Sequence, residues 1–405
     1  MDAGAPRKPA LGFIFITLVL IVLGFSIIIP VLPDLVKDFE GGDVAHGSWA
    51  YGWLIGTYAA AQFISAPILG SLSDRFGRRK VILIALAGSA VDYVIMGKAP
   101  SLTWLFIARL ISGMTAGSLG TCNAYIADVT PPEKRAQGYG LVGAAFGLGF
   151  VIGPVIGGYF GRINHRLPFF VAAGCVGLNW LYGALVLPES LPPPSRRPFS
   201  WKRANPVGSF VALRRFRGVV DLALMYFIVM FGQAMLQSVW VLYTELRYHW
   251  TIFQVSLSLT FLGITAVVVQ GGLVRRIIAM TGERRGLVIG LIVSGIIMTA
   301  YGFATEGWMI YVLVVIGAFG GISGPAAQAL ITKHVPANEQ GAVQGSLSGL
   351  VSLANIFAPL IASWSFGAFI KTAPGIAFYE AGALMILALA LAFRSFRIDD
   401  RVGVA

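Results

Sequence analysis

Long apolar segments recur along nearly the whole chain and are separated by short polar stretches. A bilayer core of about 30 Å needs roughly 20 apolar residues in a helix that rises about 1.5 Å per residue. The chain has twelve segments of this kind. They fall near residues 11–33, 48–70, 80–98, 102–128, 137–160, 168–187, 220–244, 251–272, 286–304, 308–332, 340–369 and 375–394. The pattern therefore predicts an all-α membrane protein with twelve transmembrane helices.

The composition supports this interpretation. Charged residues make up 12% of the 405 residues and hydrophobic residues 57%, whereas a soluble protein usually carries about 25% charged residues. Cys122 and Cys175 both lie inside apolar segments, so we predict no structural disulfide. The first apolar run superficially resembles a secretion signal, but it lacks an A-x-A-like cleavage site, and we interpret it as a retained first helix.

Basic residues gather in alternate connections between the predicted spans. With the N-terminus in the cytoplasm, 23 of the 30 Lys and Arg residues lie on the cytoplasmic side, and six lie on the other. This asymmetry predicts a multi-pass protein of the cell inner (plasma) membrane with both termini in the cytoplasm. The same distribution explains the net charge of +12 without a nucleic-acid partner.

The longest polar interruption, at 188–219, is rich in Pro and Arg and divides the spans six and six. We therefore predict an N-terminal six-helix half at 1–187, a cytoplasmic linker at 188–219 and a C-terminal six-helix half at 220–405. A short echo between SDRFGRRKVILIALAGSA and IAMTGERRGLVIGLIVSG indicates internal duplication. Gly with basic residues is also common at helix joints, so the echo by itself does not decide the point.

Two ionisable residues lie inside predicted spans, where an unpaired charge costs several kcal/mol. Asp92 in the third span and Arg109 in the fourth lie roughly 10 Å below the outer surface, because the two helices run antiparallel. We expect them to share one polar network. Asp92 is then a candidate carboxyl group for protons or substrate, tuned by Arg109; the alternative is a structural ion pair that only orders the N-terminal half.

A second group of polar side chains is a candidate for a substrate cavity. Gln233, Gln237 and Trp240 fall on one face of the seventh span, and Gln270 and Asn355 are further candidates. Amides beside an aromatic plate suit a large, partly apolar ligand, but a polar helix–helix contact is an equal alternative. Glu245 and Glu380 fall near outer helix ends, and we expect them at the membrane interface.

Several segments resemble a known family. The stretch GSLSDRFGRRK at 70–80 resembles the signature of the major facilitator superfamily, and GFVIGPVIGG at 149–158 resembles the motif of its drug/proton antiporters. The likeness extends to tetracycline efflux (TetA-type) proteins through IIIPVLPDLV, AYIADVTPPEKRAQGYG, LPFFVAA, EGWMIYVLVVIGAFGGISGPAAQAL and EQGAVQGSL. The resemblance implies the fold of that superfamily, two six-helix halves that work by alternating access.

The first of these stretches has two readings. Its charges anchor a short cytoplasmic connection and cap helices, and the resemblance further implies a gating latch that pairs with Asp128 in one state and releases it in the other. Asp128 has a plain alternative as a cap before Pro131 and Pro132. The candidate gating residues are Gly70, Asp74, Arg75, Gly77, Arg78, Arg79 and Asp128.

The second stretch places small residues at spacings of three or four around a proline. Such spacing lets a partner helix approach closely, and Pro154 removes one backbone hydrogen bond. Close packing and a pivot for alternating access are physically compatible readings. The export direction is implied by the resemblance alone. The motif residues are Gly149, Gly153, Pro154, Gly157 and Gly158.

The sequence departs from the tetracycline exporters at three positions. The family carries an acid in its first helix, where this chain has Ile21. Its histidine in the eighth helix and aspartate in the ninth align with Ala266 and Ser294. Proton coupling is therefore expected to rest on the N-terminal half.

The sequence thus predicts a secondary transporter that exports a hydrophobic or amphiphilic drug such as tetracycline, coupled to protons, and confers antibiotic resistance. A facilitator or importer of a small metabolite and a transport-inactive membrane receptor are the alternatives. No ATP-binding loop of the G-x-x-x-x-G-K-[ST] type is present, which excludes a primary pump of that type. We expect no enzyme activity, cofactor or metal, and a monomer surrounded by lipid.

Overall fold

The computed structural model describes residues 11–130, 135–199, 201, 219–336 and 339–402. Within these ranges the secondary structure is helical and contains no strand. Twelve helical segments in this part of the chain are long and apolar enough to cross a membrane, which confirms the predicted multi-pass membrane protein. The elements are α1 (Leu11–Ile28), α2 (Leu32–Phe39), α3 (Val44–Phe76), α4 (Arg78–Lys98), α5 (Leu102–Ala116), α6 (Ser118–Val129), α7 (Arg135–Gly161), α8 (Leu167–Val186), η2 (Pro193–Ser195), α10 (Val219–Tyr248), α11 (Ile252–Val268), η3 (Val269–Leu273), α12 (Val274–Thr281), α13 (Glu283–Phe303), α14 (Gly307–Gly317), η4 (Ala318–Ile322), α15 (Ser323–Lys333), α16 (Gln340–Ala368) and α17 (Ile376–Val402).

The chain divides into two compact units. The first comprises Met1–Leu35 and Ala60–Pro206, and the second comprises Val36–Ala59 and Val207–Ala405. Of the predicted linker, residues 200 and 202–218 lie outside the described residues, as do residues 131–134 of the AYIADVTPPEKRAQGYG segment.

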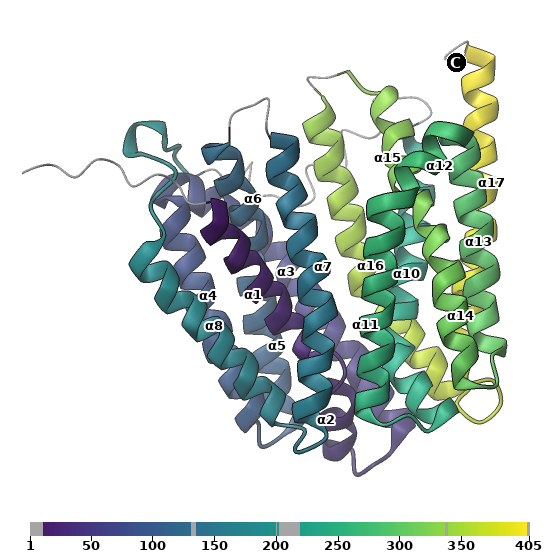
Figure 1. Cartoon of the computed structure of the whole chain (residues 1–405), viewed down its shortest axis with the longest axis horizontal. Coiled ribbons are helices and arrows are strands. Elements are labelled where there is room, and N and C mark those ends of the chain that lie inside the picture. Colours follow the sequence, from purple (N-terminus) through teal and green to yellow (C-terminus); the bar gives the residue numbers. More distant parts are fainter. Residues whose placement is uncertain (1–10, 131–134, 200, 202–218, 337–338, 403–405) are drawn as a thin grey trace, which may run out of the picture. The chain divides into compact units, whose positions relative to one another are not determined.

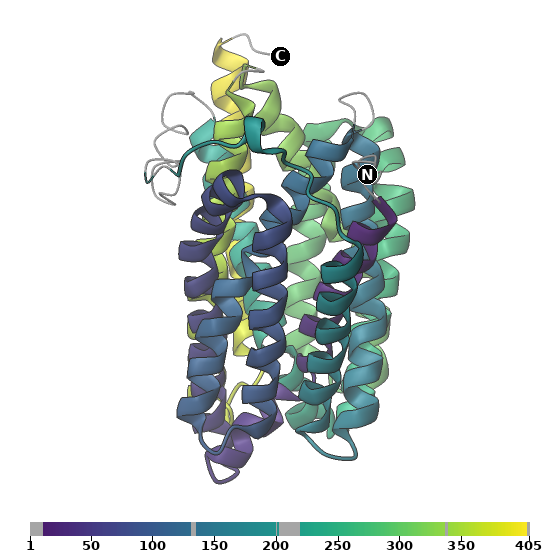
Figure 2. The same cartoon turned by 90° about the vertical axis from the view of Figure 1, so that its left-hand side faces the viewer.

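In the first unit, α1 packs against α7 and α8, and α4 packs against α5 and α8 (Figures 1 and 2). The apolar side chains between these helices are buried, among them Phe13, Leu18, Leu105 and Phe169. Polar contacts also cross this core; for example, the hydroxyl of Thr17 donates to the side-chain oxygen of Asn179 at 3.1 Å. Close helix packing therefore fixes the unit around its buried polar groups.

In the second unit, α10 packs against α16 and α17, and α13 packs against α17 and α15. Its core is aromatic and includes Trp240, Tyr243, Phe366 and Phe378, all buried. The segment 36–59 belongs to this unit, although the sequence assigned it to the N-terminal half. A hydrogen bond from Ser48 Oγ to the Ser363 carbonyl at 3.1 Å joins α3 to α16.

Four predicted spans are interrupted rather than single α-helices, and one of them, the eighth, passes from α11 into the π-helical segment η3. The first breaks between α1 and α2 at Pro30, which lacks the N–H that a continuous helix needs. The fourth breaks at Gly117, where an added Cβ would lie 2.8 Å from the Ala66 Cα. In the tenth, η4 contains Gly320, where a Cβ would overlap Ser294 Oγ. Both glycines therefore allow a neighbouring helix to come unusually close.

The expected loop at 71–80 is helical at both ends. α3 continues to Phe76, α4 begins at Arg78, and Gly77 alone connects them. Gly77 has φ +101°, a conformation that residues with a Cβ rarely adopt. α3 has 33 residues, so at about 1.5 Å per residue it is about 50 Å long, which exceeds a bilayer core of about 30 Å. This excess length carries Asp74 and Arg75 out of the apolar segment on the same helix.

Candidate functional site

The buried charge of the first unit lies between α4 and α5. Asp92 is fully buried, and Arg109 is 5% exposed. Arg109 Nη2 lies 3.9 Å from Asp92 Oδ2. The antiparallel helices therefore bring together the two ionisable residues that the sequence placed at the same depth.

The surroundings of this pair are sparsely polar. Arg109 Nη2 lies 2.7 Å from Met96 Sδ and 3.4 Å from Ser112 Oγ. Neither oxygen of Asp92 accepts a hydrogen bond of standard geometry from the described residues. The nearest charge to the Asp92 carboxyl group is therefore the Arg109 guanidinium, in a buried and sparsely polar setting.

Arg78 is the centre of a second charged cluster, at the junction of α3 and α4. Its Nη1 lies 2.6 Å from Asp74 Oδ1, and its Nε lies 3.2 Å from Asp128 Oδ2. Nη1 also donates to Ser73 Oγ at 2.5 Å. The Arg78 side chain is only 10% exposed. The guanidinium therefore bridges the ends of α3 and α6, joining the predicted motif to Asp128.

The remaining motif residues have separate roles in the packing. Arg79 donates to the Ala184 carbonyl of α8 at 2.7 Å, and the Arg75 guanidinium lies 5.0 Å from the centre of the Phe76 ring. A Cβ at Gly70 would meet nothing within 4 Å. Gly70 is therefore not required by local crowding.

Sequence reasoning missed Glu189 and Ser190, which follow α8. Glu189 Oε1 accepts the Arg78 backbone N–H at 2.8 Å, at the start of α4, where Gly77 supplies no side-chain cap. Ser190 Oγ donates to Asp128 Oδ2 at 3.1 Å. The segment LPES after the sixth span was the available signal, but only the tertiary structure shows that its acid caps a helix more than 100 residues away.

The glycine motif of α7 packs against α1. A Cβ at Gly149 would lie 2.6 Å from Val22 Cγ1, and a Cβ at Gly153 would overlap Ser26 Oγ. A Cβ at Gly157 would overlap the carbonyl of Ile27. Ser26 Oγ donates to the Gly149 carbonyl at 2.7 Å. The motif therefore makes a helix contact closer than any side chain allows.

The other two motif residues are both buried, and α7 continues through them. Pro154 lies inside the helix, and Gly158 follows on the packed side. The proline therefore does not end α7.

The structure separates the cavity candidates of the seventh span. Gln237 is exposed and Gln233 is half-buried. Trp240 is 1% exposed, its indole N–H donates to Ser258 Oγ at 3.1 Å, and its ring meets Tyr301 edge-on. The indole is thus part of the core of the second unit, because it is buried and its one donor already has a partner.

The remaining candidates lie on other helices. Gln270 and Asn355 are both exposed, and Gln270 lies in the π-helical segment η3. A Cβ at Gly321 would lie 3.2 Å from Gln270 Nε2. The cavity found within the second unit is lined by α13 and α17 and includes none of the five candidate residues.

Two acids that were expected at the interface have partners in the second unit. Glu245 Oε2 lies 2.6 Å from Lys37 Nζ, and the side chains are 13% and 19% exposed. Glu380 Oε2 lies 2.9 Å from Ser365 Oγ. Within the described residues, no group of three or more metal-binding side chains is present.

Known proteins share this sequence and this fold. The family model of the Major Facilitator Superfamily matches residues 14–282 and 222–404. A tetracycline resistance protein, class C, of Escherichia coli is 37% identical over 94% of this chain and 95% of its own length. The class B protein of Escherichia coli is 34% identical over 84% of both chains.

Solved structures agree at the level of the fold. The crystal structure of the human organic anion transporter MFSD10 (TETRAN) has a TM-score of 0.71 at 24% identity and covers 96% of this chain and 100% of that one. With the family match over most of the sequence, this chain is a member of the major facilitator superfamily and is related to its tetracycline resistance proteins.

Proposed function

We propose that this protein exports a hydrophobic or amphiphilic drug such as tetracycline across the membrane in exchange for protons. The relatives named for tetracycline resistance favour efflux over a metabolite facilitator or a receptor. The observation that carries proton coupling is the buried Asp92 beside Arg109. A charge inside a membrane protein is costly enough that it is kept mainly for function.

In the proposed cycle, Asp92 takes up a proton when the site faces one side and releases it when the site faces the other. Arg109 stabilises the carboxylate between these steps, because a cation beside it favours the charged form. Drug binding and proton binding then exclude each other if both use this region. This competition couples the exit of drug to the entry of protons, so the exchange needs no energy source other than the proton gradient.

The charged cluster around Arg78 is the proposed inner latch. The acidic partners of Arg78, Asp74 and Asp128, are 28% and 23% exposed, so water screens these ion pairs, and screened pairs contribute only about 0–1 kcal/mol each. They therefore bias the balance between two states and do not lock one of them. Glu189 supports the latch by fixing the backbone at Arg78.

The test is flux of tetracycline into liposomes under an imposed pH gradient. We expect uptake that depends on the gradient in the unchanged protein, and no gradient-driven uptake in Asp92→Asn, with normal insertion. Asp43→Asn is a matched control, because Asp43 lies in an exposed turn between α2 and α3. Full gradient-driven flux in Asp92→Asn would contradict the coupling role; flux without any gradient dependence would favour a facilitator.

We also propose a monomer with both termini in the cytoplasm and six spans in each half. The excess of basic residues on one side supports this orientation. A tag at either end should react with a membrane-impermeant label only after the cells are opened. Labelling of either tag in intact cells would contradict the orientation.

A further inference from the structure

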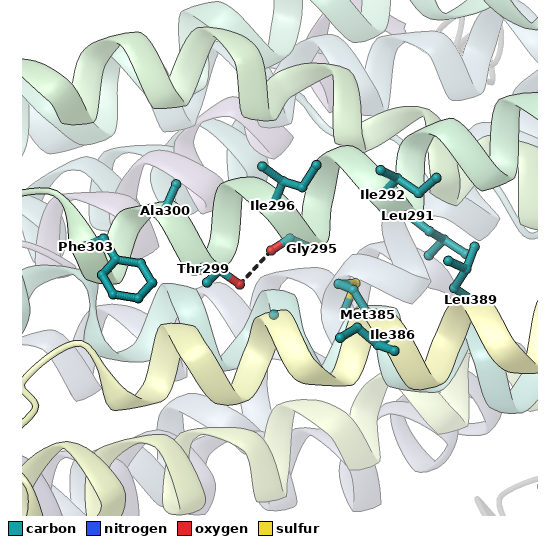
Figure 3. Close-up of a pocket in the computed structure, with 11 residues that line it drawn as sticks. Leu291, Ile292, Gly295, Ile296, Thr299, Ala300, Phe303, Met385, Ile386 and Leu389 are labelled. Atoms are coloured by element: carbon teal, nitrogen blue, oxygen red, sulfur yellow. Dashed lines mark hydrogen bonds between the residues drawn. The ribbon is translucent and has the colours of Figure 1, made fainter.

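An apolar groove lies between α13 and α17 of the second unit. Its volume is about 490 Å³, and eleven residues line it. Figure 3 shows Ile296, Ala300 and Phe303 along α13, with Met385 and Ile386 on the facing helix. The one polar side chain that lines it, Thr299, donates its hydroxyl to the Gly295 carbonyl at 2.8 Å. The groove therefore offers no hydrogen bond to a polar ligand from the side chains that line it.

The groove faces outward from the helices that form it. Ile296, Phe303 and Ile386 are 62%, 69% and 71% exposed. Glycines bring the two helices together beneath it, because a Cβ at Gly382 would overlap Thr299 Oγ1 and one at Gly295 would lie 3.1 Å from the Met385 Cβ. Both helices are membrane spans, so an exposed apolar surface here is covered by hydrocarbon.

A basic cluster lies at one end of the same two helices. The Arg284 guanidinium stacks on the Phe396 ring at 5.1 Å from its centre, which brings the start of α13 against the last turns of α17. Arg285 and Arg397 lie beside this contact in the sequence and are both exposed.

The groove and the basic cluster share one face of α13. Arg285 precedes Ile292 by seven residues, so it lies on the same face about 10 Å away. Ile289 lies between them and is 41% exposed, so the apolar surface continues from the groove to the cluster.

Other charges near this end already have partners. Arg394 Nε lies 3.2 Å from Asp221 Oδ2 on α10, and Glu283 pairs with Lys333 at 2.5 Å. The acids of α10 and α13 at this end are thus occupied by cations other than Arg285 and Arg397. Residues 283–285 and 394–401 together carry five arginines and three acids, Asp399 and Asp400 among them, so the net charge of these two segments is positive.

We propose that this groove and its arginine end form a binding site for an anionic phospholipid. The phosphate contacts Arg285 and Arg397, and the distal part of one acyl chain lies in the groove. One leaflet of hydrocarbon is about 15 Å thick, half of a core of about 30 Å, so a chain that starts below the arginines passes Ile292. The basic end is the one that the charge distribution assigns to the cytoplasm, where anionic lipids gather around basic pockets between helices.

Arg285 and Arg397 favour an anionic phospholipid over the other possible occupants of the groove. A second copy of the chain, or a drug, would need the apolar groove but not two exposed cations. The site does not depend on drug export, because neither Asp92 nor the cluster around Arg78 takes part. Its test is therefore a binding measurement, and its failure leaves the proposed function untouched.

The experiment titrates the purified protein in detergent with phosphatidylglycerol and counts bound lipid by native mass spectrometry, with phosphatidylcholine as the neutral probe. We expect preference for phosphatidylglycerol in the unchanged protein. Arg285→Gln with Arg397→Gln should weaken that binding about 30-fold, from about 1 kcal/mol per basic residue near the surface. The control, Lys371→Gln with Lys98→Gln, removes two exposed charges at other positions of the chain and should leave binding unchanged.

A second variant tests the groove itself. Ile296→Trp adds a large ring at an exposed position and should lower affinity for long-chain phosphatidylglycerol while short-chain lipid still binds. Equal losses in the arginine variant and its control would indicate a diffuse charge effect and overturn the proposal. Unchanged binding of phosphatidylglycerol to the arginine variant would overturn the proposal as well. So would a dimer that forms without lipid and that Ile296→Trp abolishes.

Discussion

Asp92 and Arg109 are an acid and a base buried in a part of the first unit that packs mainly apolar side chains. At 3.9 Å the two charges are close enough to stabilise each other, but removal of either one leaves the other buried. Loss of one partner of a buried pair is usually more destabilising than replacement of both. A single substitution in the pair is therefore expected to be more destabilising than the double substitution.

We expect Arg109→Met to lower the thermal stability of the purified protein. Arg109→Met with Asp92→Asn should regain part of that loss, with a coupling energy of about 0.5–3 kcal/mol, as for residues in contact. Thermal unfolding in detergent measures the stability of the single and the double variant. Strictly additive losses would mean that the two side chains do not interact.

At the scale of the element, the contact between α1 and α7 depends on three glycines at a spacing of four. Each approaches the backbone or side chains of α1 more closely than a Cβ permits. Because every added atom must displace a helix, the motif constrains a whole contact and not a single position. Gly77 has a similar role at the junction of α3 and α4, through its backbone conformation.

Gly153→Ala tests this contact. The added Cβ would overlap Ser26 Oγ, and overpacking of this kind costs about 1–3 kcal/mol. Gly143→Ala in the same helix is the control, because a Cβ there meets nothing within 4 Å, and alanine is the better helix former. Equal thermal stability of the two variants would contradict the close packing of α1 and α7.

At the scale of the whole molecule, one segment from the early part of the chain belongs to the same compact unit as the C-terminal helices. Residues 36–59 of α2 and α3 belong to the second unit, and Lys37 pairs with Glu245 there. An element that contributes to both units must bend, shift or exchange contacts when the transporter changes state. We therefore expect the strength of the Lys37–Glu245 pair to affect the transport cycle.

Lys37→Glu should reduce tetracycline flux and stability, because two acids would then meet at a site where the native side chains are only 19% and 13% exposed. The double variant Lys37→Glu with Glu245→Lys restores opposite charges and should recover most of the lost flux and stability. Flux into liposomes and thermal unfolding provide the readouts. Lys98→Glu, an exposed change at the end of α4, serves as the control, and failure of the exchange to rescue would contradict the pairing.

The sequence by itself determined the twelve spans, because lipid requires about 20 apolar residues per helix regardless of what the helix packs against. It also placed Asp92 and Arg109 at one depth, since helix rise converts residue number into depth. The resemblance identified the two motifs. These features depend on local composition and spacing, which a linear pattern records.

Only the tertiary structure decided which distant groups meet. Glu189 caps α4, Lys37 pairs with Glu245, and Trp240 turns inward to Ser258. Each contact depends on how two helices rotate and approach, and no local pattern encodes that rotation. The breaks at Gly117 and η4 follow from the same cause, because a neighbouring helix decides whether a glycine there allows close approach. The sequence thus specified where the charges lie along each helix, and packing specified what each one faces.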